Sequence, residues 1–145
     1  MPYWRLFYHV VWSTEDRQPW IDPAWEVDLH GYIRGKATAL ECPLQAIGGM
    51  LDHIHVVISI PPSQSIATIV GQLKGASSHY ANEHFVPDKD FSWQSEYGLL
   101  SVSESMLSKV VAYVLNQKKH HAEDNLFDLL ENFGVSLTPD GKLSG

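Results

Sequence analysis

The distribution of apolar, β-branched and polar residues divides the chain into strand-like and helix-like stretches. Runs rich in aromatic and β-branched residues are typical of strands, and apolar residues at a spacing near 3.6 are typical of amphipathic helices. The clearest strand ends at Pro61 and Pro62, and Ser65 then begins a helix. The pattern predicts strands over 3–13, 43–49, 53–60 and 97–102, and helices over 24–40, 65–84, 103–121 and 125–133.

The order of these elements predicts the fold class. A β-α-β-β-α-β order followed by further helices is the ferredoxin-like arrangement, an α+β fold with one antiparallel sheet covered by helices on one side. The length of 145 residues suits a single core. We therefore assign residues 1–133 to one domain and residues 134–145 to a polar tail.

Composition narrows the class of protein. The chain is 44% hydrophobic and 19% charged, which is ordinary for a soluble globular protein. Its apolar runs are too short to span a bilayer, and its N-terminal residues do not resemble a signal peptide. The single cysteine, Cys42, excludes an intrachain disulfide and a cysteine-based zinc cluster. We expect no membrane association and a reducing, cytoplasmic setting.

Charge is distributed unevenly along the chain. The net charge of −7 argues against nonspecific binding of nucleic acid. Residues 105–122 nevertheless hold Lys109, Lys118 and Lys119 with no acid, whereas residues 123–145 hold five acids and one lysine. A basic segment therefore precedes an acidic tail, although a solvated helix face shows similar charge runs.

A pair of histidines lies inside the most apolar strand. His53 and His55 are two positions apart, so strand geometry sends both imidazoles to the same face. Two neutral imidazoles there can hold one divalent metal ion, but two hydrogen-bonded core histidines are an equally simple explanation. Asp52 could orient one ring, although its side chain should face the other way if the strand includes it. Other single histidines that could contribute are more often structural, namely His9, His79 and His84.

Two rival histidine motifs fit poorly. Histidine-triad nucleotide hydrolases need a third alternating histidine, and position 57 is Val57. Two-histidine phosphodiesterases need Thr or Ser two residues after each of two separate histidines, and neither follows His53 or His55 in this way.

A tyrosine and a glutamine share one side of the predicted helix over 103–121. Tyr113 and Gln117 are four positions apart at the edge of its apolar face. Tyrosines at such edges usually serve in packing. Together with His53 and His55, however, the amide oxygen of Gln117 would complete a site for Mg²⁺ or Mn²⁺, and Tyr113 would be a nucleophile toward a phosphodiester.

Four sequence blocks resemble one known family. GGMLDHIHVVISIPP contains His53-Ile54-His55, a His-hydrophobic-His (HUH) triplet, and it is followed by QLKGASSHY, FSWQSEYGLLSVS and YVLNQKKHH. These blocks, in this order, are similar to those of the small single-tyrosine HUH transposases of minimal insertion sequences and their repeat-associated, often domesticated relatives. The resemblance covers about residues 3–133.

The resemblance implies a fold, a substrate and roles for individual residues. It implies an RRM-like sheet, a homodimer whose tyrosine helix commonly completes the partner's site, and cleavage and rejoining of single-stranded DNA beside a hairpin. It assigns His53, His55 and Gln117 to the metal and Tyr113 to the covalent 5′-phosphotyrosine linkage. A domesticated hairpin nickase and a non-catalytic hairpin-binding protein are the alternatives.

Two features depart from the family pattern. Glu15 and Asp16 stand where the family usually has Lys and Asn, and the net charge is negative for a protein that holds DNA. Basic residues that could contact phosphate locally include Lys74, Lys118 and Lys119, and for Lys74 a solvated side chain is an equal alternative.

Overall fold

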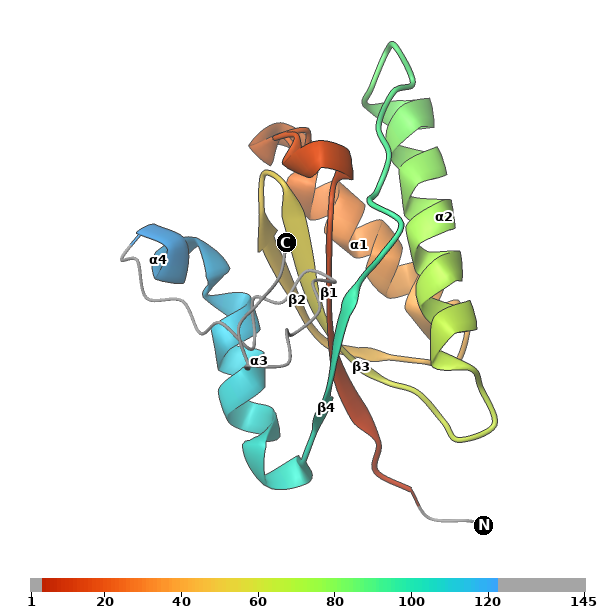
Figure 1. Cartoon of the computed structure of the whole chain (residues 1–145), viewed down its shortest axis with the longest axis vertical. Helices are drawn as coiled ribbons and strands as arrows, with labels where there is room; N and C mark the ends of the chain where they lie inside the picture. Colours follow the sequence, from red (N-terminus) through yellow and green to blue (C-terminus); the bar gives the residue numbers. More distant parts are fainter. Residues whose placement is uncertain (1–3, 123–145) are drawn as a thin grey trace, which may run out of the picture.

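A four-stranded antiparallel sheet forms the centre of the structure, a computed structural model that describes residues 4–122 (Figure 1). Its strand order is β2-β3-β1-β4. The strands are β1 (Phe7–Ser13), β2 (Leu44–Met50), β3 (His53–Ser59) and β4 (Gly98–Val102). The helices are α1 (Pro23–Ala39), α2 (Ile66–His84), α3 (Leu107–Leu115) and α4 (Gln117–Ala122), with 3-10 turns η1 (Glu15–Arg17) and η2 (Glu104–Met106). This topology confirms the predicted ferredoxin-like fold.

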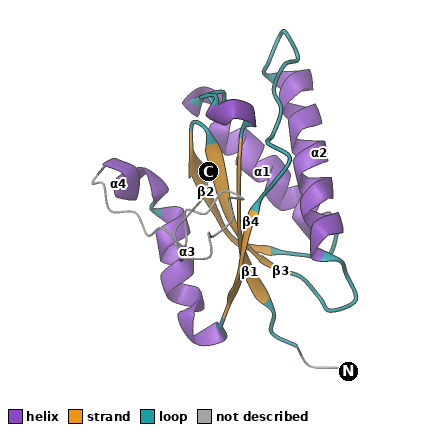
Figure 2. Cartoon of the chain, viewed as in Figure 1, coloured by secondary structure: helices purple, strands orange, loops and turns teal. Residues whose placement is uncertain are grey.

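The two faces of the sheet are covered by different helices. Helices α1 and α2 pack on one face, and α3 lies on the other (Figure 2). Alternation along the strands sends Trp12 and Ile54 to the first face, and Phe7 and Val57 to the second. All seven residues of β3 are therefore buried, which explains why this strand is apolar throughout its length. Among residues 4–122, no helix has both the length and the apolar character that a membrane span requires.

Both long helices begin at side-chain caps. Asp22 accepts a hydrogen bond from the Ala24 amide at 2.8 Å, and Pro23 occupies the first helical position of α1. The hydroxyl of Ser65 accepts from the Thr68 amide at 3.3 Å and begins α2. The predicted bounds of these two helices are confirmed to within one residue.

The predicted helix over 103–121 is wrong in its continuity. The chain forms η2, then α3, and breaks at Asn116 before α4 begins. The Asn116 side chain donates to the carbonyl oxygen of Ala112 at 2.7 Å, and its backbone leaves helical geometry at φ −105° and ψ 28°. The Asn116 backbone N–H donates to the same carbonyl oxygen, at 3.1 Å, so the break lies in the changed backbone angles at Asn116 and not in a lost backbone bond. The predicted helix over 125–133, the domain boundary at 133 and the polar tail lie outside the described residues.

A close approach of backbone to backbone fixes α3 on the sheet. Gly48 of β2 lies against the last turn of α3, where an added Cβ would clash with the carbonyl oxygen of Val114. Any other residue at position 48 would push the helix away from the strand. This glycine thus sets the distance between α3 and the sheet face that carries the histidines.

Candidate metal and nucleophile site

The two histidines of β3 lie side by side under α3. His53 and His55 share the sheet face that α3 covers, and both are fully buried. Their ring centroids are 5.1 Å apart. Strand alternation predicted this arrangement, and the tight pairing of β3 with β1 and β2 on either side holds both rings in place.

An acidic residue orients the first ring. Asp52 lies in the turn between β2 and β3, outside the strand, so its side chain turns back and its Oδ1 lies 2.7 Å from His53 Nδ1. The other carboxylate oxygen accepts from Arg17, at 3.1 Å from Nε and 3.0 Å from Nη2. Burial alone would raise the pKa of Asp52, but its bonds to His53 and Arg17 lower it to about 2. The carboxylate is therefore ionised and able to hold a proton-bearing Nδ1.

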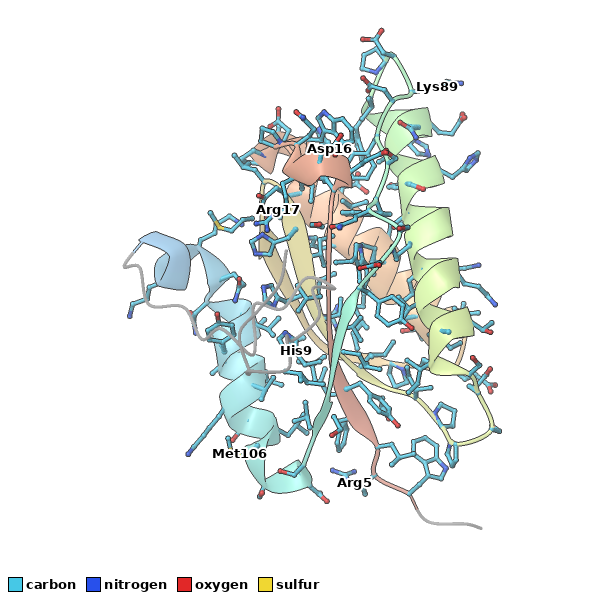
Figure 3. All side chains as sticks on the ribbon, viewed as in Figure 1. Arg5, His9, Asp16, Arg17, Lys89 and Met106 are labelled. Atoms are coloured by element: carbon cyan, nitrogen blue, oxygen red, sulfur yellow. The ribbon has the colours of Figure 1, made fainter. Side chains whose placement is uncertain are left out.

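A third histidine orients the second ring. His9 of β1 faces α3 (Figure 3), and its Nε2 lies 2.8 Å from His55 Nδ1. The two rings stack with centroids 5.0 Å apart. If His55 Nδ1 carries the proton and donates it to His9, the lone pair of His55 is on Nε2. In both histidines of β3, Nδ1 thus contacts a protein group, and Nε2 is the atom suited to a metal.

Tyr113 and Gln117 cover the two histidines on the side of the sheet where α3 lies. Tyr113 of α3 is 4% exposed and Gln117 of α4 is 1% exposed. The Tyr113 ring meets the His55 ring edge to face, with centroids 6.1 Å apart. Gln117 Oε1 lies 3.4 Å from His53 Nε2. Residues from two distant segments therefore meet at one buried point.

The donor set is one that can hold a divalent ion. Within residues 4–122, no three His, Cys, Asp or Glu side chains are arranged to hold a metal, so an ion here needs the amide oxygen of Gln117. Two neighbouring ligands of an octahedral ion lie about 3.0 Å apart. The separation of 3.4 Å between His53 Nε2 and Gln117 Oε1 is close to that spacing. Two imidazoles with one oxygen ligand can hold a divalent ion, and a donor set without thiolate or thioether is a poor one for soft metals.

Comparison with known proteins identifies the family. The family described as "Transposase IS200 like" matches residues 2–117, which is most of the chain. The chain belongs to the IS200-like transposase family.

Individual relatives agree with this family. The ISDra2 transposase TnpA of Deinococcus radiodurans is 27% identical over 122 residues, covering 79% of this chain and 85% of the relative. The transposase of insertion sequence element IS200 from Salmonella typhimurium is 32% identical over 123 residues, covering 84% of this chain and 80% of the relative. This IS200-like transposase is therefore a DNA transposase by family.

Solved structures share the fold. A structure described as a transposase from Deinococcus radiodurans R1 superposes with a TM-score of 0.65 at 25% identity, covering 86% of this chain and 95% of that one. A REP-associated tyrosine transposase bound to a REP hairpin superposes with a TM-score of 0.62 at 12% identity, covering 83% and 74%. The second likeness shows the fold alone.

The three predicted DNA-contacting lysines lie in different surroundings. Lys74 of α2 donates to the carbonyl oxygens of Gln94 and Glu96, at 2.6 and 3.0 Å, and burial lowers its pKa although Glu96 opposes the shift. Lys118 of α4 pairs with Glu26 of α1, and Lys119 is exposed on α4. Lys74 thus stabilises a loop on the far side of the sheet from α3. Phosphate contacts by these lysines stay a prediction.

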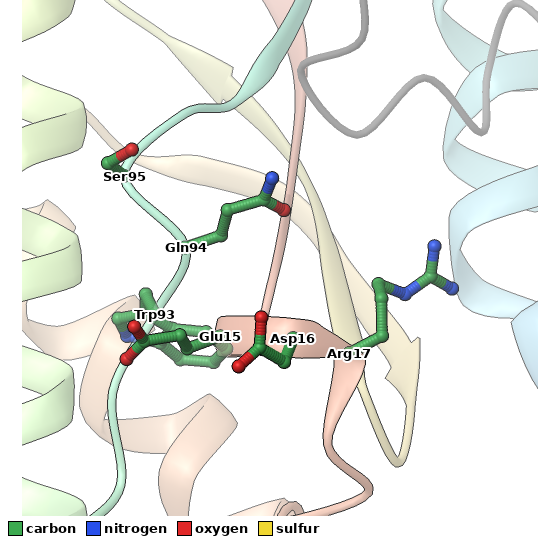
Figure 4. A pocket seen from close by; sticks show the side chains of 6 residues that line it. All are labelled: Glu15, Asp16, Arg17, Trp93, Gln94 and Ser95. Atoms are coloured by element: carbon green, nitrogen blue, oxygen red, sulfur yellow. The ribbon is translucent and has the colours of Figure 1, made fainter. Parts of the chain in front are cut away.

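A polar cavity lies at the end of β1, next to the histidines. It has a volume of about 370 Å³ and is lined by Glu15, Asp16, Arg17, Trp93, Gln94 and Ser95 (Figure 4). The chain of contacts from Arg17 through Asp52 to His53 links this cavity to the site. The two acids that depart from the family pattern therefore line a cavity just beyond Ser13, the residue of β1 that pairs with His53.

Two residues at the site have no signal in the sequence. Arg17 reaches Asp52 because η1 turns through left-handed backbone at Asp16 and Arg17, with φ of 56° and 55°. Glu26 meets Lys118 because α1 passes beside α4. Both contacts depend on elements far apart in the chain, and neither residue lies in a motif that indicates its partner.

Proposed function

We propose that this IS200-like transposase is a metal-dependent endonuclease and strand transferase that uses Tyr113 on single-stranded DNA beside a hairpin. The observation that carries the proposal is the convergence of His53 and Gln117, 64 positions apart, with His55 and Tyr113 at one buried site. Packing alone does not require two imidazoles, an amide and a phenol at the same point.

His53, His55 and Gln117 would hold Mg²⁺ or Mn²⁺. Such an ion would polarise the scissile phosphodiester and stabilise the departing 3′ oxygen. Asp52 and His9 contact the Nδ1 atoms of His53 and His55, which would leave each Nε2 as the atom that could bind the ion.

Tyr113 would attack the phosphorus. The bond between the phenol oxygen and phosphorus would form as the bond from phosphorus to the 3′ oxygen breaks, and the proton that the phenol releases to solvent would be balanced by one that the departing 3′ oxygen takes up. The product is a 5′-phosphotyrosine and a free 3′-hydroxyl. A 3′-hydroxyl from another DNA end reverses the step and rejoins the strands without an external energy source. Because Tyr113 is 4% exposed, α3 or the tyrosine ring has to shift for DNA to reach it.

The proposed substrate and the proposed homodimer follow from the resemblance to the family. A relative of the same fold is bound to a REP hairpin, which supports a hairpin-bearing single strand as the substrate. We expect a homodimer, which sedimentation equilibrium of the full chain would test. In this structure α3 packs on the sheet of its own chain.

The function is tested by a covalent-adduct assay. Incubation with a hairpin-bearing single strand and Mn²⁺ should give a protein–DNA adduct that survives denaturation, and Tyr113→Phe should abolish it while binding is retained. His53→Ala and His55→Ala should lose Mn²⁺ binding and cleavage together. Binding of hairpin DNA with no adduct from the unmodified chain would instead favour a non-catalytic hairpin-binding protein. Cleavage by both histidine variants in chelator would exclude the metal.

A further inference from the structure

The helix that carries Gln117 is short, and its sequence contains no large apolar residue. Helix α4 follows the break at Asn116, spans Gln117–Ala122 and has the sequence QKKHHA. Apolar contacts of Val110 and Val114 fix α3, but α4 has no comparable apolar side chains. A helix of six residues is not stable by itself in water. The position of α4 therefore depends on its polar contacts.

One lysine of α4 contacts two other elements of the fold. Lys118 Nζ lies 2.6 and 2.8 Å from the two carboxylate oxygens of Glu26 and 3.2 Å from the carbonyl oxygen of Gly49. Glu26 belongs to α1 and Gly49 to β2. The ammonium group of Lys118 thus joins three elements, and its own residue is the neighbour of Gln117 in the chain.

The surroundings of Glu26 make this contact selective. The Glu26 side chain is only 11% exposed, so its carboxylate is partly removed from water and needs a cation. His30, one turn further along α1, supplies that cation poorly, since burial lowers its pKa despite the opposing charge of Glu26. A cavity of about 300 Å³ lies beside the pair and is lined in part by His30, Asn116 and Gln117. Helix α4 therefore has space to shift if the contact is broken.

We propose that Glu26 and Lys118 form a clasp that positions Gln117 for the metal. This inference rests on the proposed function, in which Gln117 Oε1 is the third ligand beside His53. Glu26 and Lys118 are positioning residues that touch neither the metal nor DNA in this role. Exposed ion pairs contribute little to stability, but a metal ligand has to be held within about 0.5 Å of its productive position. A weak contact can therefore have a large effect on metal affinity.

The test uses the full chain and two measurements without DNA. Mn²⁺ affinity is measured by calorimetry, and hydrogen exchange of the α4 amides is measured in the metal-free protein. The variants are Glu26→Gln, Lys118→Met, the double variant and the conservative Lys118→Arg. Lys109→Met, which removes a charge from an exposed position on α3, is the matched control.

The clasp predicts a specific pattern across these variants. Each single variant should weaken Mn²⁺ binding by about 10-fold or more, the scale seen when groups behind metal ligands are removed. The double variant should bind Mn²⁺ no more weakly than the single variant with the lower affinity, because both substitutions break the same contact. Exchange in α4 should be faster in all three, whereas Lys118→Arg and Lys109→Met should behave like the unmodified chain.

Other outcomes distinguish a failure of the clasp from a failure of the proposed metal site. Unchanged α4 exchange in Glu26→Gln and Lys118→Met, or effects that simply multiply in the double variant, would overturn the clasp. If the unmodified chain does not bind Mn²⁺ but α4 exchange responds as predicted, the clasp stands and the metal site of the proposed function fails.

Discussion

Each histidine of the candidate site is oriented through its Nδ1 atom. Asp52 accepts from His53 and is itself held by Arg17, while His9 meets His55 across β1 and β3. A carboxylate behind a metal-binding imidazole fixes the tautomer and makes the ring a better ligand. The residues behind the ligands therefore decide which nitrogen of each ring is presented.

The role of the carboxylate gives a prediction at this scale. Asp52→Asn keeps an oxygen for His53 but removes the charge that pairs with Arg17, so we expect Mn²⁺ affinity to fall by about 10-fold or more. Calorimetry at constant pH measures the change. Retained affinity in Asp52→Asn would show that the carboxylate is not needed behind His53.

The stability of Asp52→Asn toward acid tests the same carboxylate independently of metal binding. The pKa of Asp52 is lowered in the folded state from its ordinary value of 3.8 to about 2. Its contribution to stability is therefore fully present above about pH 4 and is lost as pH falls through 2. The unmodified chain should be more stable than Asp52→Asn at pH 7, and the difference should shrink as pH falls from 4 toward 2.

At the scale of elements, one face of α3 and the start of α4 both packs on the sheet and covers the histidines. Val110, Tyr113, Val114 and Gln117 all face the sheet, with valines packing on the apolar part of the face and the other two over the histidines. Gln117 stays on the same face as Tyr113 across the break at Asn116, because its Nε2 donates to the Tyr113 carbonyl oxygen, at 3.4 Å. The fit of α3 against β2 therefore sets the position of Tyr113.

Gly48 gives a prediction at this scale. Gly48→Ala would place a Cβ against the Val114 carbonyl oxygen, so α3 has to move outward. We expect the free energy of unfolding to fall by about 1–3 kcal/mol, as for an overpacked core, and Mn²⁺ affinity to fall with it. Urea unfolding and calorimetry measure the two effects.

A glycine in an open position is the matched control. An added Cβ at Gly71 of α2 meets nothing within 4 Å. Gly71→Ala should therefore be neutral or stabilise the chain by up to about 1 kcal/mol, because alanine is the better helix former. Equal behaviour of the two variants would show that the contact between β2 and α3 is not tight.

At the scale of the whole molecule, the distribution of charge matters more than its sum. The net charge is −7, yet DNA binding requires a favourable electrostatic potential only along the surface that the strand contacts. Acidic residues at η1 lie on the cavity that adjoins the histidines, and Arg17 beside them is paired with Asp52. These acids are expected to weaken binding of a strand that passes over this end of the sheet.

Removing one of these charges gives the prediction at this scale. Asp16→Asn should increase affinity for hairpin-bearing single-stranded DNA and steepen its dependence on salt, because less repulsion of phosphate remains. Asparagine tolerates the left-handed backbone of this position, where φ is 56°. Fluorescence anisotropy at several salt concentrations measures both quantities.

Glu41 is the matched control for this charge. It is also an acid with left-handed backbone, at φ 63°, but it lies before β2, at the opposite end of that strand from the turn beside the histidines. Glu41→Asn should change affinity less than Asp16→Asn does. If the two variants behave alike, only net charge matters and DNA does not pass over η1.

The sequence by itself determined the local features of this protein. Hydrophobic periodicity located the strands and the helices α1 and α2, and the order of elements led to the ferredoxin-like fold. Alternation along β3 was enough to place His53 and His55 on one face. These features depend on neighbours within a few residues, so they can be read from a pattern.

Only the tertiary structure decided what surrounds those histidines. His9 reaches His55 across 46 positions, Arg17 reaches Asp52 across 35 and Lys118 reaches Glu26 across 92. Asp52 faces His53 because the turn between β2 and β3 places Asp52 outside the strand. The contacts of His9, Arg17 and Lys118 depend on how strands pair and helices pack, and no local pattern encodes them.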